Sequence, residues 1–96
     1  MNPFFVYILQ CADKSYYAGQ TDDLEVRIAK HDSGYYAGYT SSRLPVKLVY
    51  AATFYSRDEA LEVERQIKKW KRSKKEALIN ENWKVVHLLS KRSQKD

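Results

Sequence analysis

Two short runs of β-branched and aromatic residues, separated by a few turn-forming residues, constrain the fold of this chain most. The first run is Phe4–Leu9 and the second is Ser15–Gln20. Both have the composition of β-strands, and Ala12-Asp13-Lys14 between them favours a turn. The two runs therefore predict an antiparallel β-hairpin.

The length of the turn decides which side chains share a face of this hairpin. With a three-residue turn, Tyr7 lies opposite Gly19, and Tyr7 and Tyr17 become diagonal neighbours on one face. With a two-residue turn the two phenols would point to opposite faces, so both alternatives stay open. In the first arrangement Gly19, which has no side chain, leaves open space beside Tyr7.

Three helices and one further strand are predicted after the hairpin. Each helix is expected to begin at a capping pair: Asp22 with Glu25, Ser56 with Glu59, and Ser73 with Glu76. Gly34 marks the end of the first helix. A loop rich in Gly, Tyr and Ser continues to Pro45, and Val46–Tyr55 is predicted to be the third strand.

Length and cysteine content indicate one cytoplasmic domain. The 96 residues are predicted to form a single domain over 1–96, with its core at about 3–82 and a flexible tail at 90–96. The single cysteine, Cys11, cannot form an internal disulfide, which suits a reducing cytoplasm. We expect no signal peptide and no membrane segment, because the N-terminal apolar run is too short to span a bilayer.

Positive charge is concentrated toward the C-terminus. Residues 1–66 have seven Lys and Arg against nine Asp and Glu, whereas residues 67–96 have ten against three. A basic third of this kind suits an anionic partner such as nucleic acid, although a solvated basic helix has the same composition. The expected nucleic-acid contacts are Arg43, Lys68, Lys69, Lys71, Arg72, Lys74 and Lys75.

Three polar side chains from the helices could join the two phenols. Arg27 and His31 are four residues apart on the first helix and share a face. Glu64 lies one turn after Ala60, beside the apolar stripe of the second helix. A guanidinium, an imidazole and a carboxylate could therefore meet the phenols in one shallow site. Each residue also has an ordinary explanation, since tyrosines are common in strands and charged residues on helix surfaces.

In the order of these residues the chain resembles the GIY-YIG nuclease superfamily, and closely its small stand-alone bacterial branch. The first motif matches as Phe5-Val6-Tyr7 and the second as Tyr17-Ala18-Gly19. The family's arginine and the following histidine or tyrosine correspond to Arg27 and His31, and its metal-binding glutamate corresponds to Glu64. The resemblance covers nearly the whole chain.

The resemblance implies an α+β fold, in which a three-stranded antiparallel sheet is flanked by helices and carries a nuclease site on one face. Glu64 would bind one Mg²⁺ or Mn²⁺, Tyr17 would help to activate the attacking water as a base, and Arg27 would hold the scissile phosphate. Tyr7 would orient the water or Tyr17. His31 would assist protonation or contact the phosphate.

The sequence departs from the family pattern at three positions. Phe5 replaces the glycine of the first motif, Ala18 is the middle residue of the second, and Gln20 stands where several active relatives have lysine. The favoured function is a metal-dependent endonuclease acting on DNA rather than RNA, with branched, damaged or flapped structures of DNA repair as candidate substrates. The alternative is a catalytically weak or inactive nucleic-acid-binding module using the same site. Target specificity would come from the chain's own basic surface or from a partner protein.

Overall fold

A computed structural model describes residues 3–36 and 38–80, and it contains the hairpin expected from the sequence. Strand β1 (Phe4–Gln10) pairs with β2 (Tyr16–Thr21) on one side and with β3 (Lys47–Phe54) on the other. Both pairings are antiparallel, and the strand order is β2-β1-β3. The expected α+β fold with a three-stranded antiparallel sheet is confirmed, and β2 is an edge strand.

A three-residue turn sets the register of the hairpin. The N–H of Lys14 donates to the carbonyl of Cys11 at 2.9 Å, and Lys14 has a left-handed φ of 72°. A turn followed by one left-handed residue is a common way to close a hairpin of this length. Tyr7 pairs with Gly19, so the two-residue alternative is wrong. Tyr7 and Tyr17 therefore project from the same face of the sheet.

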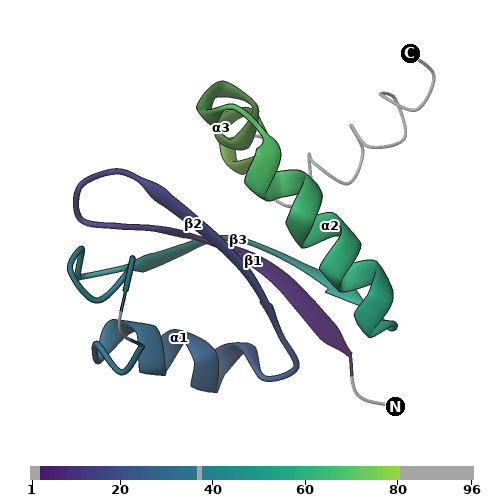
Figure 1. Cartoon of the computed structure of the whole chain (residues 1–96), viewed down its shortest axis with the longest axis horizontal. Coiled ribbons are helices and arrows are strands. Elements are labelled where there is room, and N and C mark those ends of the chain that lie inside the picture. Colours follow the sequence, from purple (N-terminus) through teal and green to yellow (C-terminus); the bar gives the residue numbers. More distant parts are fainter. Residues whose placement is uncertain (1–2, 37, 81–96) are drawn as a thin grey trace.

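Helices cover both faces of the sheet (Figure 1). Helix α1 (Leu24–Asp32) lies on the face from which Tyr7 and Tyr17 project, whereas α2 (Arg57–Lys69) and α3 (Arg72–Asn80) lie on the other. The main core cluster lies between the sheet and α2. Its buried members are Val6, Ile8, Ala18, Ala60 and Ile67.

Helix α1 begins one residue later than the sequence pattern indicates. The N-cap is Asp23, whose side chain accepts a hydrogen bond from the N–H of Val26, and not Asp22. The reason lies in Thr21, which still belongs to β2. Its hydroxyl accepts from the N–H of Asp23 at 3.1 Å and so holds the intervening residue outside the helix. The predicted stop is confirmed, since Gly34 follows the helix with a left-handed φ of 77°.

The predicted start of α2 is confirmed and that of α3 is wrong. Ser56 caps α2 by accepting from the N–H of Glu59 at 3.4 Å. Ser73 lies within the first turn of α3 instead of capping it. Glu76, the expected capping partner, instead accepts hydrogen bonds from Arg72 at 3.0 Å and from the Tyr16 hydroxyl at 3.3 Å. The bond from Tyr16 attaches α3 to β2.

Two sequence expectations concern parts of the chain that the structure does not describe. The tail at 90–96 and the end of the expected core beyond residue 80 lie outside the described residues. Within residues 3–36 and 38–80, no helix has the length and apolar character needed to cross a membrane.

The ring of Tyr7 leaves no room for a side chain at Gly19. A Cβ atom there would lie 2.5 Å from the Tyr7 hydroxyl oxygen and 2.7 Å from Cζ. We expect Gly19→Ala to lower the free energy of unfolding by about 1–3 kcal/mol, because the ring or the strand must move. Urea denaturation measures this change. In a double-mutant cycle, Tyr7→Leu should remove most of the penalty, and simple additivity of the two changes would rule out the clash as its cause.

Candidate active site

A buried chain of hydrogen bonds lies beneath the candidate site. The Tyr7 hydroxyl is 3.1 Å from Nε2 of His31, and Nδ1 of His31 is 2.9 Å from the hydroxyl of Thr40. All three side chains are buried, and Tyr7 is 0% exposed. They come from β1, from α1 and from the loop after α1, so the chain of bonds holds these three segments together. Thr40 was not among the residues singled out from the sequence.

Burial keeps Tyr7 and His31, the two titratable residues in this series of hydrogen bonds, uncharged at neutral pH. It raises the pKa of Tyr7 to about 12, and the neighbouring Arg27 offsets only part of this rise. It also lowers the pKa of His31, and the positive charge of Arg27 lowers it further. Because both nitrogens of His31 are already bonded and Tyr7 is fully enclosed, the geometry favours a supporting role for both over direct contact with water or phosphate.

Two further predicted residues, Tyr17 and Arg27, are partly exposed and lie beside these buried hydrogen bonds. Tyr17 on β2 is partly exposed, and its ring centroid is 5.1 Å from that of His31. Arg27 on α1 has its guanidinium carbon 5.3 Å from the ring centroid of Tyr36, and its Nη1 lies 3.5 Å from the backbone carbonyl of Gln20. The structure therefore brings together four of the five predicted catalytic residues on the α1 side of the sheet.

Glu64, the fifth residue, approaches from the α2 side. Its carboxylate is paired with Lys68 of the same helix at 2.9 Å. The Lys68 ammonium in turn lies 5.8 Å from the ring centroid of Tyr17. Tyr17 is thus flanked by α1 on one side and by α2 on the other. This is possible because β2 is the edge strand of the sheet.

Lys68 has a more central place than the sequence indicates. The sequence predicts a phosphate contact, and the side chain is exposed. Its ammonium also lies beside the carboxylate of Glu64 and the ring of Tyr17. The four-residue spacing from Glu64 was the available signal. Gln20 pairs with Val6, so it faces α2 together with the core cluster, and its Oε1 is buried without a hydrogen-bond partner among the described residues.

The oxygen donors at this edge fit a hard divalent cation that keeps most of its water. The side chain of Glu64 is 15% exposed and has one oxygen in the bond to Lys68. Mg²⁺ is commonly held by one or two carboxylates with several waters, so a single carboxylate is sufficient. Within residues 3–36 and 38–80 there is no cluster of three or more His, Cys, Asp or Glu that could form an all-protein site.

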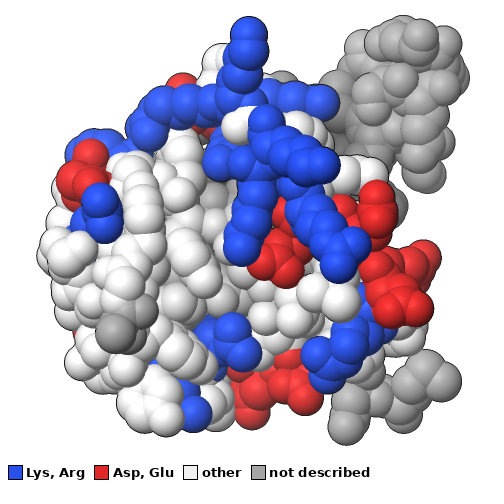
Figure 2. Space-filling view, viewed as in Figure 1, with Lys and Arg blue, Asp and Glu red and all other residues white. Residues whose placement is uncertain are grey.

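Figure 2 shows Lys and Arg side chains gathered over α3 and the C-terminal part of α2. Exposed lysines of this surface include Lys69 and Lys71. Others of the predicted nucleic-acid contacts have partners within the protein. Arg72 is paired with Glu76, and the Lys74 ammonium lies 4.4 Å from the ring centroid of Trp70.

Arg43 lies apart from this surface, in the loop between α1 and β3. Its Nε is 3.0 Å from a carboxylate oxygen of Asp13 in the hairpin turn. Lys68 therefore lies beside the candidate site, whereas Arg43 lies against Asp13 and the ring of Tyr39.

Comparison with known proteins identifies relatives over most of the chain. Residues 3–77 match the model of the GIY-YIG catalytic domain. A UPF0213 protein of Streptococcus pneumoniae is 49% identical over 78 residues, which cover 81% of this chain and 79% of that protein. A UPF0213 protein of Natronomonas pharaonis is 45% identical over 75 residues, covering 78% of this chain and 88% of that protein. 

A solved structure shares the fold as well. The solution NMR structure of a UPF0213 protein from Bacillus halodurans is 44% identical, with a TM-score of 0.56. The similarity covers 83% of this chain and 85% of that one.

The lowered pKa of His31 predicts that acid weakens the fold. The unfolded chain takes up a proton near pH 6.5, whereas the folded chain does so only at lower pH. The contribution of neutral His31 to the free energy of unfolding is therefore fully present above about pH 6.5. It is lost as the pH falls from there through the pKa of His31 in the folded protein. Urea denaturation between about pH 5 and 7.5 measures this slope.

One variant assigns the slope to His31. His31→Gln should flatten the pH dependence of the unfolding free energy in this range. An unchanged slope in His31→Gln would show that other groups control the response to acid.

Proposed function

The chain belongs to the GIY-YIG family, and on this basis we propose that it is a metal-dependent endonuclease that hydrolyses phosphodiester bonds in DNA. The observation that carries the proposal is the position of Tyr17. It stands on an edge strand between the imidazole-bearing helix α1 and the carboxylate-bearing helix α2. A phosphodiester lying along this edge can reach groups from both helices at once.

Arg27 and Tyr17, which are partly exposed, have distinct roles in this proposal. Arg27 holds a non-bridging oxygen of the scissile phosphate and offsets the charge that develops in the transition state. Tyr17 accepts a proton from the attacking water as the water oxygen bonds to phosphorus. The P–O bond to the leaving strand breaks, and solvent protonates the oxygen that is released. The buried bonds of Tyr7, His31 and Thr40 keep the base of the site rigid, so that the exposed groups retain their spacing.

Glu64 is the residue that would hold Mg²⁺ or Mn²⁺. The bound cation would supply Lewis-acid stabilisation of the phosphate and lower the pKa of a bound water. The carboxylate must exchange its bond to Lys68 for the cation, or share its two oxygens between them.

Lys68 provides the positive charge that Gln20 does not. A free phenol with a pKa near 10 is a poor base at neutral pH, so the phenolate form needs a neighbouring cation. In several family members a lysine stands at the position of Gln20. In this chain the ammonium of Lys68 lies 5.8 Å from the Tyr17 ring centroid and can fulfil the same electrostatic role.

The basic surface over α2 and α3 supports binding of the DNA backbone beyond the cleaved bond. We place this activity in the cytoplasm, where a free buried cysteine such as Cys11 stays reduced. Selection of a target would rest on this surface or on a protein partner.

One observation favours the alternative of a binding module without cleavage. The 2.9 Å ion pair with Lys68 engages the carboxylate that would hold the cation. If this pair is stable in solution, the site would bind phosphate through Arg27 and Lys68 without activating water.

Glu64→Gln should abolish metal-dependent cleavage while leaving DNA affinity in EDTA nearly unchanged, because the amide keeps the shape of the side chain and loses its charge. Cleavage is measured with single-stranded, duplex, flap and junction DNA in Mg²⁺, Mn²⁺ or EDTA.

Arg27→Ala should lower the rate by about 10²–10³-fold. Glu62→Gln is the matched control for Glu64→Gln, since Glu62 is exposed and bonds only Gln66 among the described residues.

The outcomes of this comparison are distinct. Cleavage that survives in Glu64→Gln would show that the assignment of the metal-binding residue is wrong. A wild-type chain that binds DNA but is inert on every substrate with either metal would favour the binding module.

Lys68→Met should lower the cleavage rate at saturating DNA by at least about tenfold, because the phenol of Tyr17 loses its neighbouring cation. Lys69→Met changes the next residue of the same helix and should affect only affinity. Adding Gln20→Lys to Lys68→Met should restore part of the rate. Equal rates for the two lysine variants would contradict a special role of Lys68.

A further inference from the structure

The loop that follows α1 exposes aromatic surface beside the candidate site. Tyr35 is 67% exposed and Tyr39 is 42% exposed. Cationic side chains lie against both rings: the Lys30 ammonium is 4.8 Å from the ring centroid of Tyr35, and the Arg43 guanidinium carbon is 3.9 Å from that of Tyr39. Exposed rings interleaved with positive charge are typical of surfaces that bind single-stranded nucleic acid.

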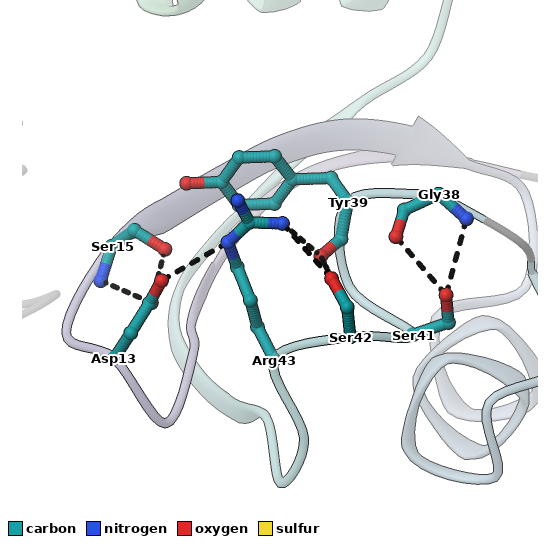
Figure 3. Close-up of polar contacts among 7 residues, drawn as sticks. All are labelled: Asp13, Ser15, Gly38, Tyr39, Ser41, Ser42 and Arg43. Carbon is teal, nitrogen blue, oxygen red and sulfur yellow. Dashed lines mark hydrogen bonds and ion pairs between the residues drawn. The ribbon is translucent and has the colours of Figure 1, made fainter.

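Arg43 is held in its position against Tyr39 by several bonds (Figure 3). Its Nε donates to Asp13 at 3.0 Å, and its Nη1 donates to the backbone carbonyl of Tyr39 at 2.9 Å and to the hydroxyl of Ser42 at 3.1 Å. Hydrogen bonds from Ser15, followed by the contact with Arg43, lower the pKa of Asp13, so the carboxylate stays charged. The guanidinium is therefore held over the face of the ring before any ligand binds.

This surface is continuous with the candidate site. The ring of Tyr39 is stacked near that of Tyr17, with centroids 6.2 Å apart and an angle of 28° between the planes. The backbone N–H of Ala12 donates to the carbonyl of Arg43 at 2.9 Å, which attaches the loop to the hairpin turn. If a phosphodiester bond lies at Tyr17, the base of the adjoining nucleotide would therefore be within reach of Tyr39.

We propose that Tyr39 and Arg43 form a stacking subsite for an unpaired nucleobase, so that the strand engaged at Tyr17 is single-stranded or locally unpaired. The position of the cleaved bond in this inference rests on the proposed function, whereas the stacking surface itself does not. In a duplex the faces of each base are covered by its neighbours, and only an unpaired base can offer its face to a tyrosine ring or a guanidinium plane.

The test is binding in EDTA, which removes any contribution from cleavage. Fluorescence anisotropy compares wild type, Tyr39→Ala and Tyr39→Phe on a labelled single strand, its RNA equivalent, the matching duplex, and a single strand with consecutive abasic sites. Tyr39→Ala should weaken single-strand binding by about tenfold and duplex binding by much less. Tyr39→Phe, which keeps the ring, should bind like wild type.

Tyr55→Ala is the matched control. Tyr55 is 68% exposed, but it follows β3 where Phe54 pairs with Phe4, at the end of the sheet opposite the hairpin turn. Its loss should leave single-strand affinity unchanged. Similar weakening by Tyr55→Ala and Tyr39→Ala would overturn the proposal.

The abasic strand tests the same inference without changing the protein. Wild type should bind it about tenfold more weakly than the intact strand, and this difference should disappear in Tyr39→Ala. Equal binding of abasic and intact strands by wild type would overturn the stacking subsite even if Tyr39→Ala fails to fold. Because no metal is present, a chain that never cleaves DNA can still confirm or overturn it. Preference for DNA or RNA is read from the two labelled strands.

Discussion

The phenol of Tyr7 crosses the backbone of Gly19 and is hydrogen-bonded to His31, and the positions of the other site residues depend on this contact. Any side chain at position 19 would push the ring away from β2. The ring positions the imidazole, the imidazole is held by Thr40, and Tyr17 lies against the imidazole from the neighbouring register position. The two motifs of the family thus meet physically as a tyrosine lying over a glycine.

Local sequence signals predict most of the sheet, the end of α1 and the start of α2. The hairpin register follows from its three-residue turn, and Ser56 marks the start of α2 as expected. The errors came from contacts distant in sequence or from competing local bonds. Thr21 shifts the cap of α1 by one residue, and the bond between Tyr16 and Glu76 joins residues 60 positions apart. Capping patterns carry no information about such partners.

For the candidate site, the sequence predicts which residues come together more readily than it predicts the surroundings of each side chain. Helical spacing brings Arg27 and His31 to one face, but it does not indicate that His31 is buried with both nitrogens bonded. The contact between Lys68 and Tyr17 was not predictable either, because it requires that β2 be the edge strand and that α2 cross beside it. The strand order depends on the long-range pairing of β1 with β3, which no local pattern specifies.

The location of the site on β2 also bears on self-association. An edge strand presents unpaired backbone groups that can template pairing with another chain, and proteins limit this by keeping such strands short and placing charges beside them. Strand β2 has only six residues, Arg27 reaches the backbone carbonyl of Gln20 from one side, and the charged pair of Glu64 and Lys68 lies on the other. We expect these charges to protect the sheet from edge-to-edge aggregation, so a variant that neutralises all of them should be less soluble.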